Sequence, residues 1–223
     1  MQKIYVHPLP VRIWHWINAA SMLVLIFTGL QIRYAGTFDL MSFRNAVMVH
    51  NWVGFLLAAN FLLWLFYYLF SDNIRMYQPE LRPGRYFPAM FKQIYFYSYG
   101  ILRGEPNPHR VSEAQKFNPM QAMTYQIVML LMLPLQFYTG LLLWDVNRFA
   151  DQIDLLGGVR VVSTAHVLLT IAFLGFLLSH LYLITLGHTA GAHTKAMITG
   201  FEEVEEAPET SPAAGASSQQ PEH

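Results

Sequence analysis

Long apolar stretches separated by shorter polar ones form the main pattern along this chain. Four of the stretches are long enough to cross a membrane, because the hydrocarbon core of a bilayer is about 30 Å thick and needs about 20 helical residues. They cover roughly residues 11–32, 46–70, 120–144 and 161–186. The pattern therefore predicts an all-α membrane protein in which four transmembrane helices form one bundle within residues 1–200.

Two other segments have a distinct composition. Residues 86–101 are rich in Phe, Tyr and Met and are bordered by Arg85 and Arg103. This composition predicts a helix in the membrane interface, and a loop whose aromatic side chains pack on the bundle is the alternative. After Phe201, five glutamates lead into a stretch of Ser, Pro, Ala and Gln, so we expect residues 201–223 to be a disordered acidic tail.

The distribution of Lys and Arg predicts the orientation of the bundle. The side of the membrane with more of these residues is normally the cytoplasmic side. One side would carry ten of them, namely Lys3, Arg12, Arg75, Arg82, Arg85, Lys92, Arg103, Arg110, Lys116 and Lys195, and the other four, namely Arg33, Arg44, Arg148 and Arg160. We therefore expect a multi-pass protein of a bacterial inner membrane, with both termini in the cytoplasm and the loops near 34–44 and 146–158 in the periplasm.

The overall composition restricts the chemistry of the chain. Its residues are 54% hydrophobic and 13% charged, and the net charge is zero, so nothing indicates nucleic-acid binding. The absence of Cys excludes thiolate metal sites, iron–sulfur clusters and covalently attached c-type haem. A bound metal or cofactor must therefore be held by His, Met or carboxylate side chains.

Four histidines lie inside the apolar stretches, where ionisable side chains are costly and usually functional. His166 and His180 are fourteen residues apart, so they share one helix face and lie about 21 Å apart along it. His15 matches His180 in depth, and His50 matches His166. A single buried His is more often a hydrogen-bonded helix contact, but the double match predicts two iron-binding pairs. His15 and His180 would hold a haem near the cytoplasmic surface, and His50 and His166 another near the periplasmic surface.

Two imidazoles per haem leave the iron no open position, so such a haem carries electrons rather than binding oxygen. Three arginines are placed to pair with haem propionates. Arg12 lies one turn before His15, and Arg44 and Arg160 stand just outside the other pair. Side chains that simply extend to the interface are the alternative for each arginine.

The residues around these histidines resemble a known family. Residues 7–16 (HPLPVRIWHW) followed by 28–32 (TGLQI) are similar to the first helix of bacterial di-haem b-type cytochromes of the cytochrome b561-like group. His50 with Gly54, the Thr139-Gly140 dipeptide and the His166/His180 spacing fit the same pattern. The group contains the membrane subunits of thiosulfate reductases, respiratory formate dehydrogenases and nickel–iron hydrogenases. The resemblance implies a four-helix fold with two b haems and the same two histidine pairs.

The resemblance also implies a function. A periplasmic iron–sulfur or c-type cytochrome subunit, bound to a catalytic subunit, would exchange electrons with the haem of His50 and His166. The haem of His15 and His180 would exchange them with membrane quinone. The polar side chains available for a quinone site at that depth are Asn18, Asn118, Gln121 and His188, of which His188 is favoured. A helix cap or an interface contact is the alternative for each.

Two other functions remain open from the sequence. A protein of the same fold acting alone as a membrane oxidoreductase is one, and the short periplasmic loops do not exclude it. A histidine-lined proton or metal transporter is the other. It would need acidic or polar groups at the midplane, and the four apolar stretches contain no Asp or Glu.

Overall fold

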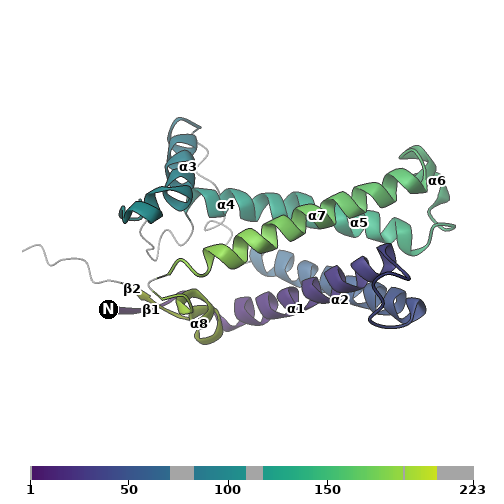
Figure 1. Cartoon of the computed structure of the whole chain (residues 1–223), viewed down its shortest axis with the longest axis horizontal. Helices are drawn as coiled ribbons and strands as arrows, with labels where there is room; N and C mark the ends of the chain where they lie inside the picture. The colour runs from purple at the N-terminus through teal and green to yellow at the C-terminus, as the bar shows by residue number, and fades with distance from the viewer. Residues whose placement is uncertain (1, 71–82, 109–117, 188, 205–223) are drawn as a thin grey trace, which may run out of the picture.

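The computed structural model describes residues 2–70, 83–108, 118–187 and 189–204, and four long apolar helical spans dominate it (Figure 1). This confirms the four predicted spans, whose ends shift by three residues at most. The spans are α1 (Leu9–Arg33), α2 (Phe43–Leu69), the continuous run of α4 (Pro119–Gln126), η3 (Ile127–Met132) and α5 (Leu133–Trp144), and α7 (Val159–Leu183).

Short elements connect and border the spans. They are β1 (Gln2–Tyr5), α3 (Pro83–Ser98), η2 (Gly100–Arg103), α6 (Ala150–Leu155), α8 (Ala192–Thr199) and β2 (Phe201–Val204). The predicted quinone candidate His188 and residues 205–223 of the predicted tail lie outside the described residues.

Local sequence sets where the spans begin. Pro10 lies in the first turn of α1, where its missing N–H would have no helical partner anyway. The hydroxyl of Ser42 caps α2 by accepting a hydrogen bond from the backbone N–H of Asn45 at 3.3 Å. Gly157 and Gly158 have φ values of 96° and 94° and so provide the turn that leads into α7.

The third span is interrupted by the π-helical segment η3. Pro134 follows this segment in the first turn of α5. Proline has no backbone N–H and cannot complete a regular helical ladder, and local π-turns accommodate such breaks. The span is nevertheless continuous in direction (Figure 1).

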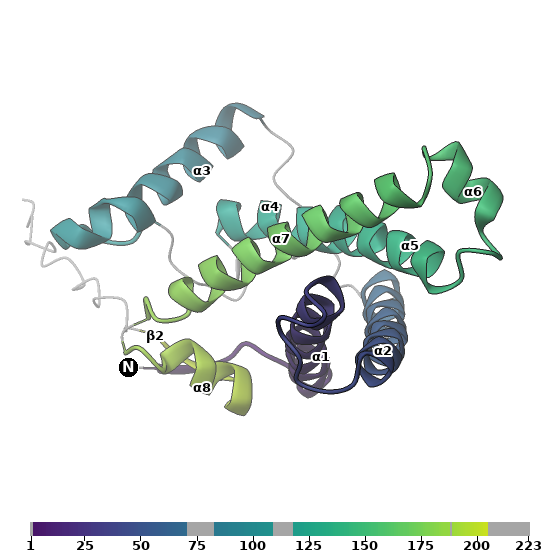
Figure 2. The ribbon, with the colours of Figure 1, turned by 45° about the vertical axis from the view of Figure 1, so that its right-hand side comes forward.

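The spans pack as two helix pairs. α1 lies along α2, and α5 lies along α7 (Figure 2). Aromatic and aliphatic side chains from α2, η3, α5 and α7 fill the space between the pairs, namely Leu57, Phe61, Trp64, Tyr68, Val128, Met129, Leu133 and Phe173. Many other apolar side chains of the spans face outward, as expected for helices surrounded by lipid.

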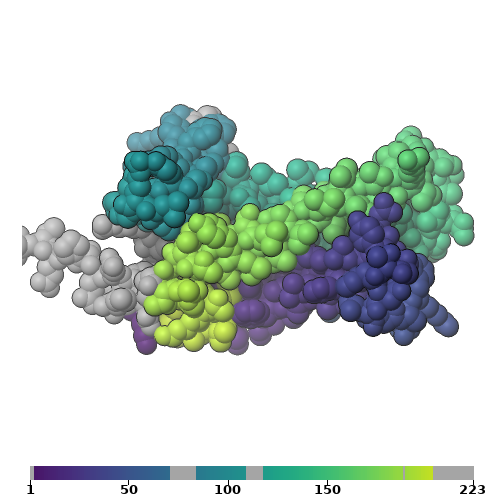
Figure 3. Space-filling view, viewed as in Figure 1, coloured from purple at the N-terminus to yellow at the C-terminus, as the bar shows by residue number. Residues whose placement is uncertain are grey.

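A segment near the start of the chain and one after α8 pair in a short two-stranded sheet. β1 pairs antiparallel with β2, so that Tyr5 lies opposite Phe201 and their rings are 5.1 Å apart. The prediction that the disordered tail begins at residue 201 is therefore wrong for residues 201–204, because these backbone groups pair with the N-terminal strand. α8 consequently lies beside the start of α1 (Figure 3).

The aromatic segment after the second span forms the helix α3, in place of a plain loop. Its buried side chains Met90, Gln93 and Phe96 recur every three residues and face the rest of the protein. α3 contacts α4 and η2 and stands to one side of the bundle, at the end where β1 and β2 lie (Figure 1).

Candidate functional site

The four intramembrane histidines come together as two pairs. The ring centroids of His15 and His180 are 6.2 Å apart, and those of His50 and His166 are 6.3 Å apart. We call His15 and His180 the first pair and His50 and His166 the second pair. Both pairs join helices that are far apart in sequence, and α7 supplies one histidine to each.

The separation within each pair matches the spacing that a shared metal ion requires. A first-row metal binds an imidazole nitrogen at about 2.0 Å, and this nitrogen lies about 1.2 Å from the ring centroid, so two rings on opposite sides of one metal need centroids about 6.4 Å apart. The observed 6.2 and 6.3 Å agree with this value. The donor set of two imidazoles in an apolar bundle also suits haem iron.

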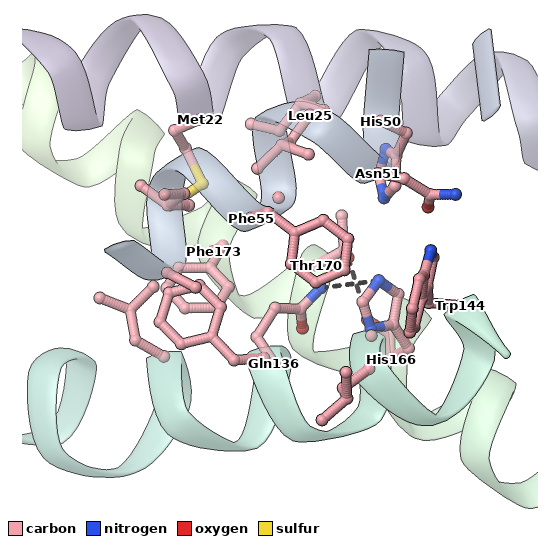
Figure 4. Close-up of a pocket in the computed structure, with 18 residues that line it drawn as sticks. Met22, Leu25, His50, Asn51, Phe55, Gln136, Trp144, His166, Thr170 and Phe173 are labelled. Atoms are coloured by element: carbon pink, nitrogen blue, oxygen red, sulfur yellow. Dashed lines mark hydrogen bonds between the residues drawn. The ribbon is translucent and has the colours of Figure 1, made fainter. Parts of the chain in front are cut away.

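The second pair faces a cavity of about 290 Å³ between the two helix pairs. This volume lies just below the range of about 300–1,000 Å³ typical of small-molecule and cofactor pockets. Figure 4 shows His50 and His166 facing each other across the cavity, with Phe55 and Trp144 at its wall. The rings of Phe55 and Trp144 meet edge to face at 5.3 Å.

A threonine hydroxyl contacts each ring of the second pair. Thr28 Oγ1 on α1 lies 2.9 Å from Nδ1 of His50 on α2. Thr139 Oγ1 on α5 lies 2.9 Å from Nδ1 of His166 on α7. The two contacts are therefore the same in atoms and in distance, and each joins the two helices of one pair. Both contacts are made at Nδ1, so Nε2 is the ring nitrogen on the side away from the threonine.

A glycine follows each of these threonines and lets the histidine ring approach. A Cβ atom added to Gly29 would lie 3.3 Å from Cε1 of His50, and one added to Gly140 would lie 3.3 Å from Cε1 of His166. Such a contact is tighter than ordinary van der Waals packing, so any larger residue at either position would push on the ring. The sequence predicted close helix or porphyrin approach at the glycines of both Thr-Gly dipeptides, but no role for the threonines.

Gln136 is a further polar residue of the cavity that sequence analysis missed. Its amide nitrogen lies 3.1 Å from Nε2 of His166 and 3.1 Å from the hydroxyl oxygen of Thr170 (Figure 4). Its amide oxygen is buried and has no hydrogen-bond partner among the described residues. A metal bond at Nε2 of His166 would require this side chain to turn away and to give up its two hydrogen bonds.

The first pair has aromatic neighbours. The ring of Trp16 meets His15 edge to face at 5.2 Å, and Phe176 stacks on His180 at 5.9 Å. Nδ1 of His15 is buried and has no hydrogen-bond partner in the described part of the chain. Burying such an atom costs free energy.

The C-terminal helix α8 fixes the start of α1 around His15. The guanidinium of Arg12 donates to the backbone carbonyl of Ile198, and the indole N–H of Trp16 donates to that of Met197 at 3.3 Å. Arg12 therefore has a protein partner, although its Nε atom is buried without one. Arg44 and Arg160, the other predicted propionate partners, are exposed at the end of the bundle nearest the second pair.

The structure separates the predicted quinone candidates. Asn118 and Gln121 form a reciprocal capping box at the start of α4, where each side chain bonds the backbone N–H of the other. Asn118 also bonds the hydroxyl of Tyr97 at 3.2 Å. The side chain of Asn18, in contrast, has a buried carbonyl oxygen without a partner among the described residues.

Four apolar helices long enough to cross a membrane, with two close imidazole pairs between them, fit the class of membrane cytochromes. The sequence comparison agrees with this class. The chain belongs to the prokaryotic cytochrome b561 family, whose model matches residues 6–200. Membership implies haem b as the cofactor and electron transport as the role.

Three relatives illustrate the family. Cytochrome YdhU of Escherichia coli (strain K12) is 34% identical over 201 residues, which are 90% of this chain and 75% of that protein. A protein of Azospira oryzae named as the methionine-sulfoxide reductase subunit YedZ1 is 24% identical over 83% of this chain and 93% of its own length. The B-type cytochrome subunit of a Ni/Fe-hydrogenase of Rhizobium leguminosarum bv. viciae is 28% identical over 81% of this chain and 80% of its own length.

Proposed function

We propose that this chain is the di-haem cytochrome b subunit of a respiratory oxidoreductase complex and connects a periplasmic redox subunit with the membrane quinone pool. The observation that carries this proposal is the pair of ring separations, 6.2 and 6.3 Å. The first pair would hold one haem b and the second pair another. Haem b bound by two imidazoles carries single electrons.

The protein's own part is to bind and orient the two haems and to exclude water. α7 places its two histidines fourteen residues apart, which separates the sites by about 21 Å along the helix. The apolar side chains between the helix pairs keep water away from the rings. Low polarity around a haem is one of the factors that set its potential.

The first test is the haem content of the purified protein. A pyridine haemochrome assay should give two b haems per chain, and the reduced-minus-oxidised spectrum should show b-type bands. One haem would contradict the pairing of all four histidines. No haem, in protein produced with ample haem supply, would contradict the proposal as a whole.

We propose further that quinone binds beside the first pair. Three buried polar atoms near this end have no hydrogen-bond partner among the described residues, namely Nε1 of Trp14, Oδ1 of Asn18 and Nε1 of Trp64. Trp14 and Trp64 lie together, with ring centroids 6.0 Å apart. Indole N–H groups can donate to the carbonyl oxygens of a quinone, and the Asn18 carbonyl can accept from a quinol hydroxyl.

The substitution Trp64→Phe tests this site, because it keeps an aromatic ring and removes the N–H donor. Haem reduction by menadiol should slow several-fold, the loss expected from one hydrogen bond. Trp52→Phe is the matched control, since Trp52 lies on the same helix and is 71% exposed. Equal rates for the two variants would rule out the Trp64 donor.

A partner complex is supported by the names of two relatives, which describe subunits of a methionine-sulfoxide reductase and of a Ni/Fe-hydrogenase. We expect a periplasmic iron–sulfur or c-type cytochrome subunit, with a catalytic subunit, to bind at the end nearest the second pair. Affinity purification of the tagged chain from mild detergent should recover such a redox protein. Its addition should oxidise or reduce the haem of the second pair before that of the first.

We propose an inner-membrane orientation with both termini in the cytoplasm. The chain has no Cys, so single cysteines report their side of the membrane without interference. Thr37→Cys, in the exposed loop after α1, should react with a membrane-impermeant maleimide in intact spheroplasts. Ser98→Cys, at the exposed end of α3, should react only after lysis, and the reverse result would invert the topology.

We also propose that α3 lies in the membrane interface. Its exposed side chains Phe87, Phe91 and Tyr95 recur every four residues and are 49%, 62% and 46% exposed. Lys92 borders this apolar stripe and suits anionic lipid headgroups. A bimane label at Phe91→Cys should be quenched by spin-labelled lipid more strongly than the same label at Lys92→Cys. Equal quenching would assign the stripe to another partner.

A further inference from the structure

The proton positions around the second pair follow from its neighbours. Thr28 Oγ1 lies 2.7 Å from the backbone carbonyl of Val24, and Thr139 Oγ1 lies 2.9 Å from that of Leu135. A carbonyl oxygen only accepts hydrogen bonds, so each hydroxyl gives its single proton to the carbonyl one turn back. The hydroxyl oxygen can then only accept from the histidine, and Nδ1 of each ring must carry the proton.

Further contacts agree with this assignment. Each hydroxyl oxygen also lies within 3.3 Å of a second backbone carbonyl, that of Leu25 for Thr28 and that of Gln136 for Thr139. The proton of each hydroxyl therefore has two carbonyl acceptors on its own helix. On the opposite side of His166, the amide of Gln136 donates toward Nε2 at 3.1 Å, which requires an unprotonated Nε2.

We propose that Thr28 and Thr139 are positioning residues that hold both imidazoles of the second pair in the Nδ1–H form and so present two unprotonated Nε2 atoms to the iron. This inference rests on the proposed two-haem function. The arrangement joins α1 to α2 and α5 to α7 in the same way. It therefore sets ring orientation and tautomer on both sides of one haem.

The contacts between the threonine hydroxyls and the histidine rings also have an electronic consequence. A histidine that donates its second ring N–H becomes a more basic ligand, and a more basic ligand favours the oxidised iron. Replacing either threonine with valine should therefore move the midpoint potential of the second haem to a more positive value. The first pair provides an internal reference, since Nδ1 of His15 has no hydrogen-bond partner among the described residues.

The test is a redox titration of the full-length haem-loaded protein. We expect Thr28→Val and Thr139→Val each to raise the potential of the second haem, and the double variant to raise it more. Thr28→Ser and Thr139→Ser should restore it, because serine retains the hydroxyl. Ser163→Ala is the control, since this hydroxyl bonds the backbone carbonyl of Arg160 on α7, one turn from His166. Loss of the second haem through His166→Ala identifies which titration component is which.

Several results would overturn the inference. An unchanged potential in the double variant with both haems bound is one. Serine variants that behave like the valine variants are another, and an equal shift of both haems is a third. If the double variant releases the second haem, its potential cannot be measured. The haem content of each single valine variant is then compared with that of the serine variant at the same position. Equal haem contents would contradict the proposal.

A second measurement does not depend on haem. Haem-free protein labelled with ¹⁵N-histidine should give two rings in the Nδ1–H form by NMR, and these signals should change in the double valine variant but not in Ser163→Ala. Rings in the Nε2–H form would contradict the threonine roles. A haem count below two in the unmodified protein would instead contradict the proposed function, so the two failures are distinguishable.

Discussion

The two histidine pairs have nearly equal ring separations, 6.2 and 6.3 Å, but they are held in different ways. Both rings of the second pair meet a threonine hydroxyl and a close glycine on the neighbouring helix. In the first pair, His15 and His180 have aromatic rings beside them. One site is thus built mainly from directed hydrogen bonds and the other from packing.

The hydrogen bonds around the two pairs also differ in how far apart in the sequence their partners lie. The threonine contacts of the second pair join residues 22 and 27 positions apart. Around the first pair, Arg12 and Trp16 bond carbonyls that are 186 and 181 positions away. The second pair therefore depends on adjacent helices, whereas the first depends on the chain ends coming together. Substitutions should be able to disturb one pair and spare the other.

Removing one imidazole is the strongest way to separate the pairs. His166→Ala should reduce the haem content from two to one per chain, because only His50 of the second pair would remain to hold a haem. The spectrum of the remaining haem should match that of the first site in the unmodified protein. Pyridine haemochrome and low-temperature spectra measure both quantities.

The converse variant completes the comparison. His180→Ala should remove the first haem and retain the second. Loss of neither haem in these two variants would contradict the pairing, and loss of both in each would show that the sites form only together.

A smaller change should weaken the second site without removing a ligand. Gly140→Ala would place a Cβ 3.3 Å from Cε1 of His166, so the ring must move by a few tenths of an ångström. We expect partial loss of the second haem and full retention of the first. Gly175→Ala is the matched control on α7, where an added Cβ meets nothing within 4 Å. It should leave haem content unchanged and stabilise the helix by about 0.5–1 kcal/mol.

These expectations show which parts of the site a sequence can reveal. The regular rise of a helix fixes depth, so the pairing of His15 with His180 and of His50 with His166 followed from position alone. The role of Thr28 did not, because its contact with His50 depends on how α1 rotates against α2. The repeated Thr-Gly dipeptide was the available signal, and its meaning needed the packing of the helices.

Other features of the structure differ in whether the sequence could predict them. β1 and β2 are four residues each and pair across the whole chain, so neither has a local pattern strong enough to predict a strand. Asn118 and Gln121, in contrast, carry the spacing of a capping box. Their use as helix caps was readable from the sequence, and it accounts for both side chains without a quinone.

The first pair should respond to changes in the terminal sheet. Gly200 has φ of 92°, and an added Cβ would lie 2.7 Å from the ring of Tyr5 and 2.9 Å from the carbonyl oxygen of His7. Gly200→Ala should therefore separate β2 from β1 and loosen the α8 contacts around His15. We expect a shift in the spectrum and potential of the first haem alone. Gly191→Ala, which meets nothing within 4 Å, is the control, and an equal effect from it would contradict the role of the sheet.

The smallest effect is expected from the contact between His193 on α8 and Glu202 on β2. Nδ1 of His193 lies 3.5 Å from Oε1 of Glu202, and the histidine side chain is 42% exposed. Exposed pairs of this kind contribute about 1 kcal/mol or less, so His193→Ala should leave both haem potentials unchanged and barely alter thermal stability. The backbone conformation of Gly200 would then account for the pairing of β1 with β2. If His193→Ala instead shifted the potential of the first haem as far as Gly200→Ala does, the pairing of β1 with β2 would depend on electrostatic attraction. The shift should then disappear at high salt.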